Sequence, residues 1–246
     1  MNSRSIWHDF RRKLIKLAHL LRTRRFLRPL AFGVAAACEH TEVLAGLTVC
    51  TVIDVGANKG QFSALALELF PGATIYAFEP LAQPFARLAA WSACEPRLVR
   101  HPMALTRGGG RAIMQVAARV DSSSLRMITD RQVALFPRTQ RVRTEEVAVA
   151  RLDSVLSPEQ LVSPVLLKID VQGSELDVLA GAGELLSRFE WIYVECSFVE
   201  LYVGQALVSE VEAFLAAAGF LPLVYWNICR DDANRPVQAD ILFGAV

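Results

Sequence analysis

Long uncharged hydrophobic stretches are missing from this chain of 246 residues, although 53% of its residues are hydrophobic. A bilayer-spanning helix needs about 20 predominantly apolar residues, so we expect no transmembrane segment. The basic amino-terminal region also lacks the uncharged apolar core and small-residue cleavage site of a secretory signal peptide. These absences predict a cytoplasmic protein.

Paired cysteines are missing as well. The five cysteines are odd in number and widely spaced, and no two of them form a CxxC motif. Such a pattern predicts reduced thiols and favours neither a disulfide framework nor a zinc site. The five are Cys38, Cys50, Cys94, Cys196 and Cys229.

Positive charge is concentrated at the amino terminus. Residues 1–30 contain nine Lys or Arg and one acidic residue, whereas the rest of the chain contains 17 basic and 24 acidic residues. This asymmetry predicts a basic helical arm, residues 1–46, followed by an acidic domain, residues 47–246. Because the body of the protein is acidic, we expect no nucleic acid partner.

The arm has the spacing of an amphipathic helix. Apolar residues recur every three or four positions, and the basic residues fall on the other side of the helical wheel. Contact of residues 4–28 with the inner face of an anionic membrane is one interpretation. The alternative is packing on the domain or on a second subunit in a homodimer. Pro29 ends or kinks this helix, and residues 30–46 predict a second, Ala-rich helix.

From residue 48 onward the pattern alternates between strands and helices. This alternation predicts an α/β fold with a doubly wound, mostly parallel Rossmann-like sheet, whose ligands bind beyond the carboxyl ends of the strands. Residues 111–120 and 141–149 predict two strands of an insertion above the sheet. Strands of the main sheet are predicted over residues 48–55, 74–78, 98–103, 165–170, 191–196, 220–227 and 240–243.

The strongest local motif is VIDVGANKGQF, residues 52–62. A buried strand reaches Asp54, turns at Gly56 and enters a helix at Gly60. Gly56 permits a tight turn and the close approach of a ligand, and Gly60 permits close packing of the helix. About 20 residues past Gly60, Glu79 follows the next strand, which is the position that binds ribose hydroxyls in nucleoside-binding sheets.

Two cofactor classes fit such a turn. A dinucleotide seats its pyrophosphate on bare backbone at the helix start, but Asn58 occupies the place of the middle glycine, and Asp54 would repel phosphate. S-adenosylmethionine (SAM) has no phosphate and carries an ammonium group, which Asp54 is suited to bind. The turn therefore favours SAM over NAD(P).

A second polar cluster lies in LLKIDVQGSELDVLAGA, residues 166–182. Lys168 and Asp170 lie two residues apart on one strand, so they point to the same side of the sheet near its carboxyl end. A lysine in a buried strand requires a carboxylate partner. The candidates are Asp170, Glu175 and, on the next strand, Glu195.

Together these segments resemble the FkbM family of SAM-dependent methyltransferases, over roughly residues 48–225. The resemblance implies a class I methyltransferase sheet, SAM as the donor, and O-methylation of a hydroxyl group on a sugar or secondary metabolite. The matching segments, in order, are DVGANKGQFS (54–63), FEP (78–80), SSL (123–125), LDSVL (152–156), KIDVQGSELDVLAGA (168–182), VE (194–195) and GF (219–220).

An alcohol acceptor loses its proton during methyl transfer, so a base near it accelerates the reaction. We expect Asp170 to be this base, Lys168 to orient it, and Glu195 to be the second candidate. The candidates for cofactor contact are Asp54, Gly56, Asn58, Gly60, Glu79 and, in a polar loop, Ser123. No spacing requires a metal, and none is assigned. Two other functions remain open: an NAD(P)-dependent oxidoreductase, and a non-catalytic binding module with the same fold.

Overall fold

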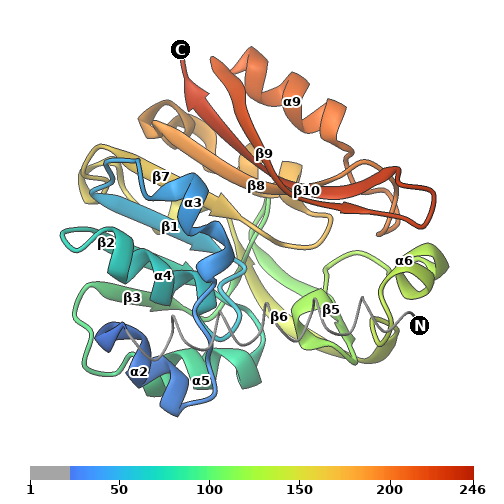
Figure 1. Ribbon diagram of the computed structural model, residues 1–246, viewed down its shortest axis with the longest axis horizontal. Coiled ribbons are helices and arrows are strands. Elements are labelled where there is room, and N and C mark those ends of the chain that lie inside the picture. Colours follow the sequence, from blue (N-terminus) through green and yellow to red (C-terminus); the bar gives the residue numbers. More distant parts are fainter. Residues whose placement is uncertain (1–22) are drawn as a thin grey trace.

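A seven-stranded sheet organises the protein, which the computed structural model describes over residues 23–246 (Figure 1). The strand order is β3-β2-β1-β7-β8-β10-β9; β3 to β8 run parallel, and β10 is antiparallel to both of its neighbours. The prediction of a doubly wound, mostly parallel sheet is thus confirmed. The bounds are β1 Thr51–Val55, β2 Thr74–Phe78, β3 Leu98–His101, β7 Val165–Ile169, β8 Trp191–Ser197, β9 Phe220–Arg230 and β10 Pro236–Ala245.

The two central strands, β1 and β7, are buried along their whole length. Their sequences, TVIDV and VLLKI, are nearly continuous apolar runs, as expected for parallel strands covered on both faces. Strand order reverses between them, because the chain builds outward first through β2 and β3 and then through β7 and β8. Ligands of open α/β sheets bind at such a reversal, beyond the carboxyl ends of the strands.

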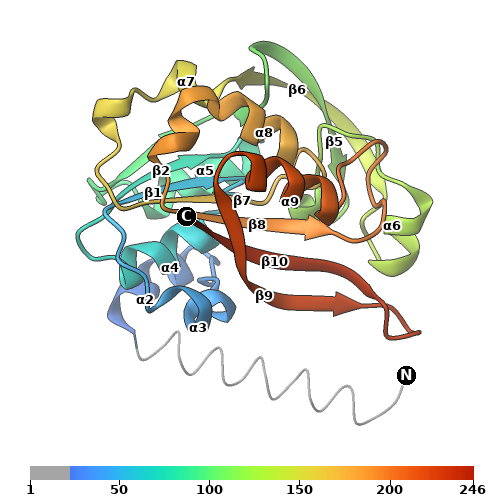
Figure 2. The same ribbon diagram turned by 90° about the horizontal axis from the view of Figure 1, so that it is seen from above.

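Helices cover both faces of the sheet (Figure 2). One layer contains α2, α4 and α5, and the opposite layer contains α7, α8 and α9. α8 ends just before Gly183, which has a φ of +52°, and a 3-10 helix continues from there to Arg188. The bounds are α2 Arg24–Ala31, α4 Gln61–Leu69, α5 Ala82–Trp91, α7 Leu152–Val155, α8 Glu175–Ala182 and α9 Val208–Ala217.

The prediction of one Ala-rich helix over residues 30–46 is wrong. α2 continues past Pro29 to Ala31, and Gly33 then turns the chain with a φ of +72°. The Ala37 amide donates to the Gln61 carbonyl at the start of α4, so this stretch crosses α4 in an extended form. Two short helices follow, a 3-10 helix Cys38–His40 and α3 Thr41–Leu44.

The described part of the arm belongs to the core of the domain. Phe26, Val34 and Leu44 are buried against α4 and the sheet. The predicted amphipathic helix falls mostly on residues 1–22, which lie outside the described residues, so it stays a prediction. Within residues 23–246, no helix is long and apolar enough to span a membrane.

The insertion forms a small second sheet of order β4-β6-β5, as the sequence predicted for its two long strands. It lies beside the carboxyl ends of the main strands in Figure 1. Ser122, Ser123 and Ser124 lie in the segment between β5 and α6, and the Ser124 hydroxyl donates to the Gln172 carbonyl just past β7. The bounds are β4 Ala104–Leu105, β5 Gly110–Ala117, α6 Asp130–Leu135 and β6 Arg141–Ala150.

Candidate active site

Three adjoining cavities lie beyond the carboxyl ends of β1, β2, β7 and β8. The inner cavity lies between the ends of β1 and β2 and the insertion, and Glu79, Met114 and Ser123 line it. The acidic cavity lies at β8 and β10 and is lined by Glu195 and Asp240. The bridging cavity lies between them, next to α4. Asp170 borders all three cavities, so it lies at their junction.

The Gly56 turn brings three strand ends together. Gly56 has a φ of +77°, and both its amide and that of Ala57 donate to the Phe78 carbonyl at the end of β2. A Cβ on Gly56 would lie 1.9 Å from the Asp170 carbonyl oxygen, just past β7. Only glycine fits this turn, so the predicted tight turn is confirmed. The close neighbour that excludes a Cβ is the backbone of Asp170, and the approach of a ligand stays a prediction.

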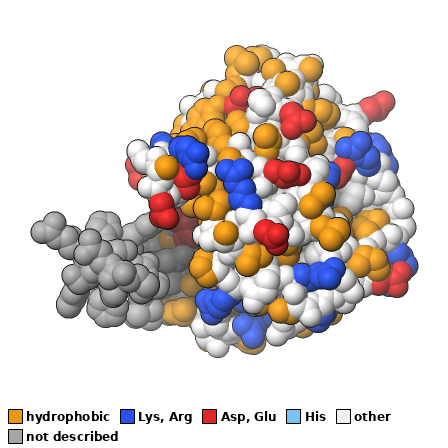
Figure 3. Space-filling model, turned by 90° about the vertical axis from the view of Figure 1, so that its right-hand side faces the viewer, with side chains coloured by type: hydrophobic (Ala, Val, Ile, Leu, Met, Phe, Trp, Pro, Cys, Tyr) orange, Lys and Arg blue, Asp and Glu red, His pale blue; other side chains and the backbone are white. Residues whose placement is uncertain are grey.

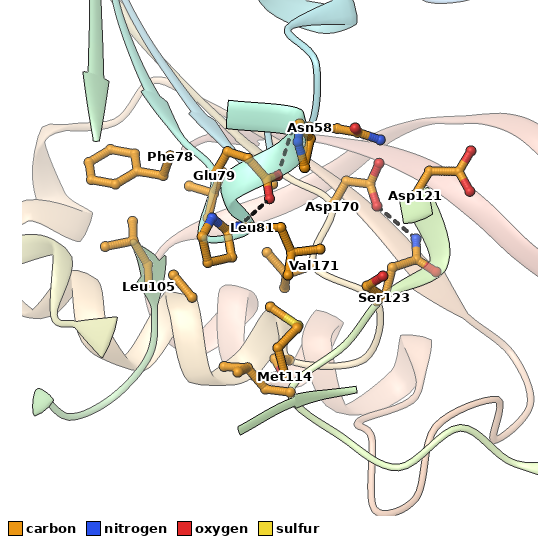
Figure 4. A pocket seen from close by; sticks show the side chains of 18 of the residues that line it. Asn58, Phe78, Glu79, Leu81, Leu105, Met114, Asp121, Ser123, Asp170 and Val171 are labelled. Atoms are coloured by element: carbon orange, nitrogen blue, oxygen red, sulfur yellow. Dashed lines mark hydrogen bonds between the residues drawn. The ribbon is translucent and has the colours of Figure 1, made fainter. Parts of the chain in front are cut away.

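Glu79 points into the inner cavity, where Figure 4 shows it. It is 5% exposed and accepts hydrogen bonds of 2.8 Å from the backbone amides of Asn58 and Leu81. Burial raises the pKa of Glu79 to about 7, against the lowering effect of these two amides. The buried side-chain oxygen of Asn58 has no hydrogen-bond partner among residues 23–246. The inner cavity therefore offers a carboxylate and an unpaired amide oxygen to a ligand.

Lys168 and Asp54 form a buried ion pair across β7 and β1. The two residues are register partners, and Lys168 Nζ lies 3.1 Å from Asp54 Oδ1. Ser63 donates to the other carboxylate oxygen at 2.6 Å. Burial opposes the charge of Lys168, but Asp54 and Asp170 outweigh it and leave the pKa of Lys168 raised. Asp54 is fully buried and lines none of the three cavities, so its carboxylate lies beneath the crevice floor.

Asp170 and Glu195 share one amide, as the sequence did not predict. Gln172 Nε2 donates to Asp170 Oδ1 at 2.8 Å and to Glu195 Oε2 at 2.5 Å. The Asp170 side chain is 38% exposed, and Lys168 Nζ lies 3.9 Å from its other oxygen. Burial, followed by repulsion from Asp170 and Asp240, holds the pKa of Glu195 well above its usual value. The structure thus brings together the three predicted catalytic residues.

Sequence reasoning missed the far wall of the acidic cavity. The Asn227 side chain donates to Asp240 Oδ2 at 2.8 Å, and His40 Nδ1 lies 2.9 Å from the Tyr193 hydroxyl. Burial raises the pKa of Asp240 to about 7. These groups come from β8, β9, β10 and the 3-10 helix before α3, so no local motif joins them. The available signal was the position of Asn227 and Asp240 at the ends of predicted strands, whereas His40 fell inside the predicted helix over residues 30–46.

Two other residues predicted to contact the cofactor, Ser123 and Gly60, interact with other parts of the protein. Ser123 lines the inner cavity, and its hydroxyl accepts a hydrogen bond from the Ala117 amide at 3.1 Å. Gly60 lines none of the three cavities; a Cβ there would lie 2.5 Å from Leu88 and 2.7 Å from Trp91, both on α5. Gly60 therefore permits close packing of α4 on α5. Among residues 23–246, no three His, Cys, Asp or Glu side chains are grouped to hold a metal.

Comparison with known proteins identifies the family of this chain. The model of the "Methyltransferase FkbM domain" matches residues 54–222. The chain is similar to the "2-O-methyltransferase NoeI" of Sinorhizobium fredii, with 32% identity over 69% of this chain and 74% of that protein. It is also similar to the "31-O-demethyl-FK506 methyltransferase FkbM" of Streptomyces tacrolimicus, with 29% identity over 69% of this chain and 72% of that protein.

Among solved structures, the chain matches Sp1610 of Streptococcus pneumoniae, described as a putative tRNA (m1A22) methyltransferase in complex with S-adenosyl-L-methionine. That match has a TM-score of 0.46 and 11% identity, over 84% of this chain and 72% of the other.

Proposed function

Because this chain belongs to the FkbM methyltransferase family, we propose that it transfers the methyl group of SAM to a hydroxyl group of a sugar or other secondary metabolite. The position of Asp170 carries the proposal. One carboxylate borders both the cavity suited to a nucleoside and the cavity suited to a polar acceptor. A base at that junction is where proton removal from an acceptor hydroxyl is needed.

The inner cavity fits the nucleoside part of SAM. The Glu79 carboxylate is suited to accept hydrogen bonds from ribose hydroxyls, and the side-chain oxygen of Asn58 has no partner among residues 23–246. Phe78, Leu105 and Met114 give the cavity apolar walls suited to a flat ring, and Figure 4 shows them on the side away from Asp170. The chemistry of these groups therefore supports an adenosine moiety in this cavity.

The same cavity disfavours NAD(P). Glu79, Asp121 and Asp170 all line it, and a pyrophosphate would meet this negative charge without a facing cation from Lys or Arg in its lining. Asn58, with a φ of +51°, occupies the place where a dinucleotide fold has its middle glycine. An oxidoreductase function is therefore the weaker alternative.

The chain's own residues are then assigned roles in the reaction. When bound, SAM supplies an electrophilic methyl group for in-line displacement by an oxygen nucleophile. Asp170 accepts the proton of the acceptor hydroxyl. Lys168, whose ammonium group lies 3.9 Å from Asp170, offsets the negative charge of that carboxylate. Glu195 accepts from Gln172 on the acceptor side and is the second candidate for proton transfer. Orienting the reactants within the crevice accounts for much of the remaining acceleration.

The lining of the acidic cavity restricts the kind of acceptor molecule that can bind there. Its lining includes Glu39, Asp170, Glu195 and Asp240, which accept hydrogen bonds from hydroxyl groups and repel phosphate. Among the described residues, basic and acidic side chains are interspersed on the face shown in Figure 3, without one large basic patch. Both observations favour a hydroxyl-rich small molecule over a nucleic acid. The names of the two similar methyltransferases, which specify 2-O and 31-O positions, support oxygen as the acceptor atom.

Three further predictions remain part of the proposal: a cytoplasmic location, a homodimer, and contact of residues 4–28 with an anionic membrane surface. Of residues 4–28, the structure describes 23–28, and Phe26 in this part is buried against the domain. The membrane contact is therefore proposed for the residues that precede Thr23.

Isotope transfer tests the function. We expect the protein, incubated with methyl-labelled SAM and cell extract, to yield a labelled small molecule that mass spectrometry identifies as a methyl ether. Binding of S-adenosylhomocysteine without any labelled product would support the binding-module alternative. Binding of NAD(P) but not of S-adenosylhomocysteine would overturn the proposal.

The pKa of Glu79 predicts a pH dependence of cofactor binding. The ionised carboxylate is the form that accepts from two ribose hydroxyls, so binding favours loss of its proton. With a pKa of about 7 in the free protein, affinity for S-adenosylhomocysteine falls about tenfold from about pH 8 to about pH 6. Calorimetry at both pH values measures this change.

Glu79→Gln is expected to remove that pH dependence and weaken binding by about 10- to 100-fold, the cost of a lost charged hydrogen bond. Glu175 and Asp240, whose pKa values burial also raises to about 7, remain in both proteins, so the difference belongs to Glu79. Glu146→Gln, on exposed β6, is the control. An unchanged pH dependence in Glu79→Gln would contradict the ribose assignment.

A further inference from the structure

We infer that Gln172 is a positioning residue that fixes the carboxylate of Asp170, and that Tyr202 sets the orientation of the Gln172 amide. The inference rests on the proposed function, in which Asp170 is the base. It assigns a role in orienting the base to Gln172, which donates to Asp170 and lines the inner cavity, and to Tyr202, which lines none of the three cavities.

The backbone around Gln172 is held from two sides. Gln172 has a φ of +57°, and the Ser124 hydroxyl of the insertion donates to its carbonyl at 2.6 Å. A Cβ on the next residue, Gly173, would lie 2.9 Å from Tyr202 Cβ, so the turn packs directly on that ring. These contacts therefore fix the backbone position from which the Gln172 side chain extends.

Hydrogen bonding then selects one orientation of the amide. The Tyr202 hydroxyl lies 2.6 Å from Gln172 Oε1 and, fully buried, it accepts from Gln132 Nε2 at 3.2 Å. An amide oxygen only accepts, so the hydroxyl proton goes to it. The amide NH₂ is thereby directed at the two carboxylates, one hydrogen for Asp170 and one for Glu195. The reversed amide would present its oxygen to both.

The second acceptor near Tyr202 does not change this conclusion. The Ser122 carbonyl lies 3.1 Å from the same hydroxyl, so it competes for the proton at a longer distance. When the hydroxyl proton turns to the Ser122 carbonyl, the Gln172 oxygen loses the one donor that it has among residues 23–246, whereas the carboxylates still require the NH₂ group. The chain Gln132–Tyr202–Gln172 therefore links the insertion to the junction of the three cavities.

The amide donors also offset the negative charge around Asp170. The cation on its own strand is Lys168, whose Nζ lies 3.9 Å away, and the acidic neighbours come from other elements. Removing a donor from an ionised carboxylate disfavours its charged form. Titratable groups that face the junction from the packed elements are Glu195 on β8, Glu175 on α8, Asp240 on β10, Asp121 on the insertion, and Glu39 and His40 before α3.

A titration that needs no acceptor tests the inference. The protein is labelled with carboxyl-¹³C aspartate, saturated with S-adenosylhomocysteine and titrated by NMR, and Asp170→Asn identifies the Asp170 signal. In Tyr202→Phe we expect the midpoint of Asp170 to rise by about one pH unit, because the amide is no longer oriented. Gln172→Leu, which removes both donors, is expected to raise it further.

Tyr76→Phe is the matched control, since it removes a hydroxyl bonded to the Gln160 carbonyl on a residue that lines none of the three cavities. Its Asp170 midpoint should equal that of the native protein. Superimposable titrations of native, Tyr202→Phe and Gln172→Leu proteins would overturn the positioning role. An Asp170→Asn variant with full transferase activity would instead overturn the base assignment, whatever the titration shows.

Discussion

Asp170→Asn is expected to lower the rate of methyl transfer by about 10²–10⁴-fold, the usual contribution of a general base. The side chain keeps its size, and its oxygen still accepts from Gln172 Nε2, so the geometry of the junction is preserved. What is lost is the capacity to take a proton from the acceptor. The loss should therefore appear in kcat, measured with the acceptor that isotope transfer identifies.

A measurement of cofactor binding distinguishes the loss of a base in Asp170→Asn from general damage to the site. Affinity of Asp170→Asn for S-adenosylhomocysteine, measured by calorimetry, is expected to stay within about threefold of the native value, because proton transfer contributes nothing to binding. Asp232→Asn, in the exposed turn between β9 and β10, is the matched control, since Asp232 lines none of the three cavities. Full turnover of Asp170→Asn would remove it as the base and leave Glu195 as the candidate.

The central strands and the first turn were predictable because their determinants are local. A β-branched apolar run specifies a doubly covered strand, and the spacing of Gly56 and Glu79 follows from the length of one helix and one strand. The structure places Glu79 in the inner cavity and Lys168 beside a carboxylate, as the sequence indicated. The nearest partner of Lys168 is nevertheless Asp54, its register partner on β1, and not one of the three carboxylates that the sequence offered; Asp170 lies farther away, at 3.9 Å.

The acceptor side was not predictable, because its residues come from distant segments. Asp240 meets Asn227 only after β9 and β10 pair as an antiparallel hairpin. His40 reaches this wall because the chain before α3 is extended rather than helical, and the Trp226 indole donates to the Glu39 carbonyl at 2.8 Å. Helix propensity of the Ala-rich segment predicted the opposite, and tertiary packing overrode it.

Lys168→Met is expected to lower the free energy of unfolding by about 3–5 kcal/mol, because it leaves the carboxylate of Asp54 buried without its cation. Asp54 is fully buried, and Ser63 supplies one hydrogen bond to it, which does not neutralise the charge. Urea unfolding followed by circular dichroism measures the loss. Lys59→Met, at a partly exposed lysine beside the same crevice, is the control, expected within about 0.5 kcal/mol of the native value.

The double variant Asp54→Asn, Lys168→Met distinguishes a buried pair from a cofactor ligand. Removing both charges leaves no unpaired ion, so most of the lost stability should return. If Asp54 also binds the ammonium group of SAM, as its position in the motif suggested, the refolded double variant will still bind S-adenosylhomocysteine at least about tenfold more weakly than the native protein. Native affinity in that variant would assign Asp54 to the crevice floor alone, where its carboxylate holds Lys168 beneath Asp170. A single Lys168→Met variant as stable as the native protein would contradict the buried-pair assignment.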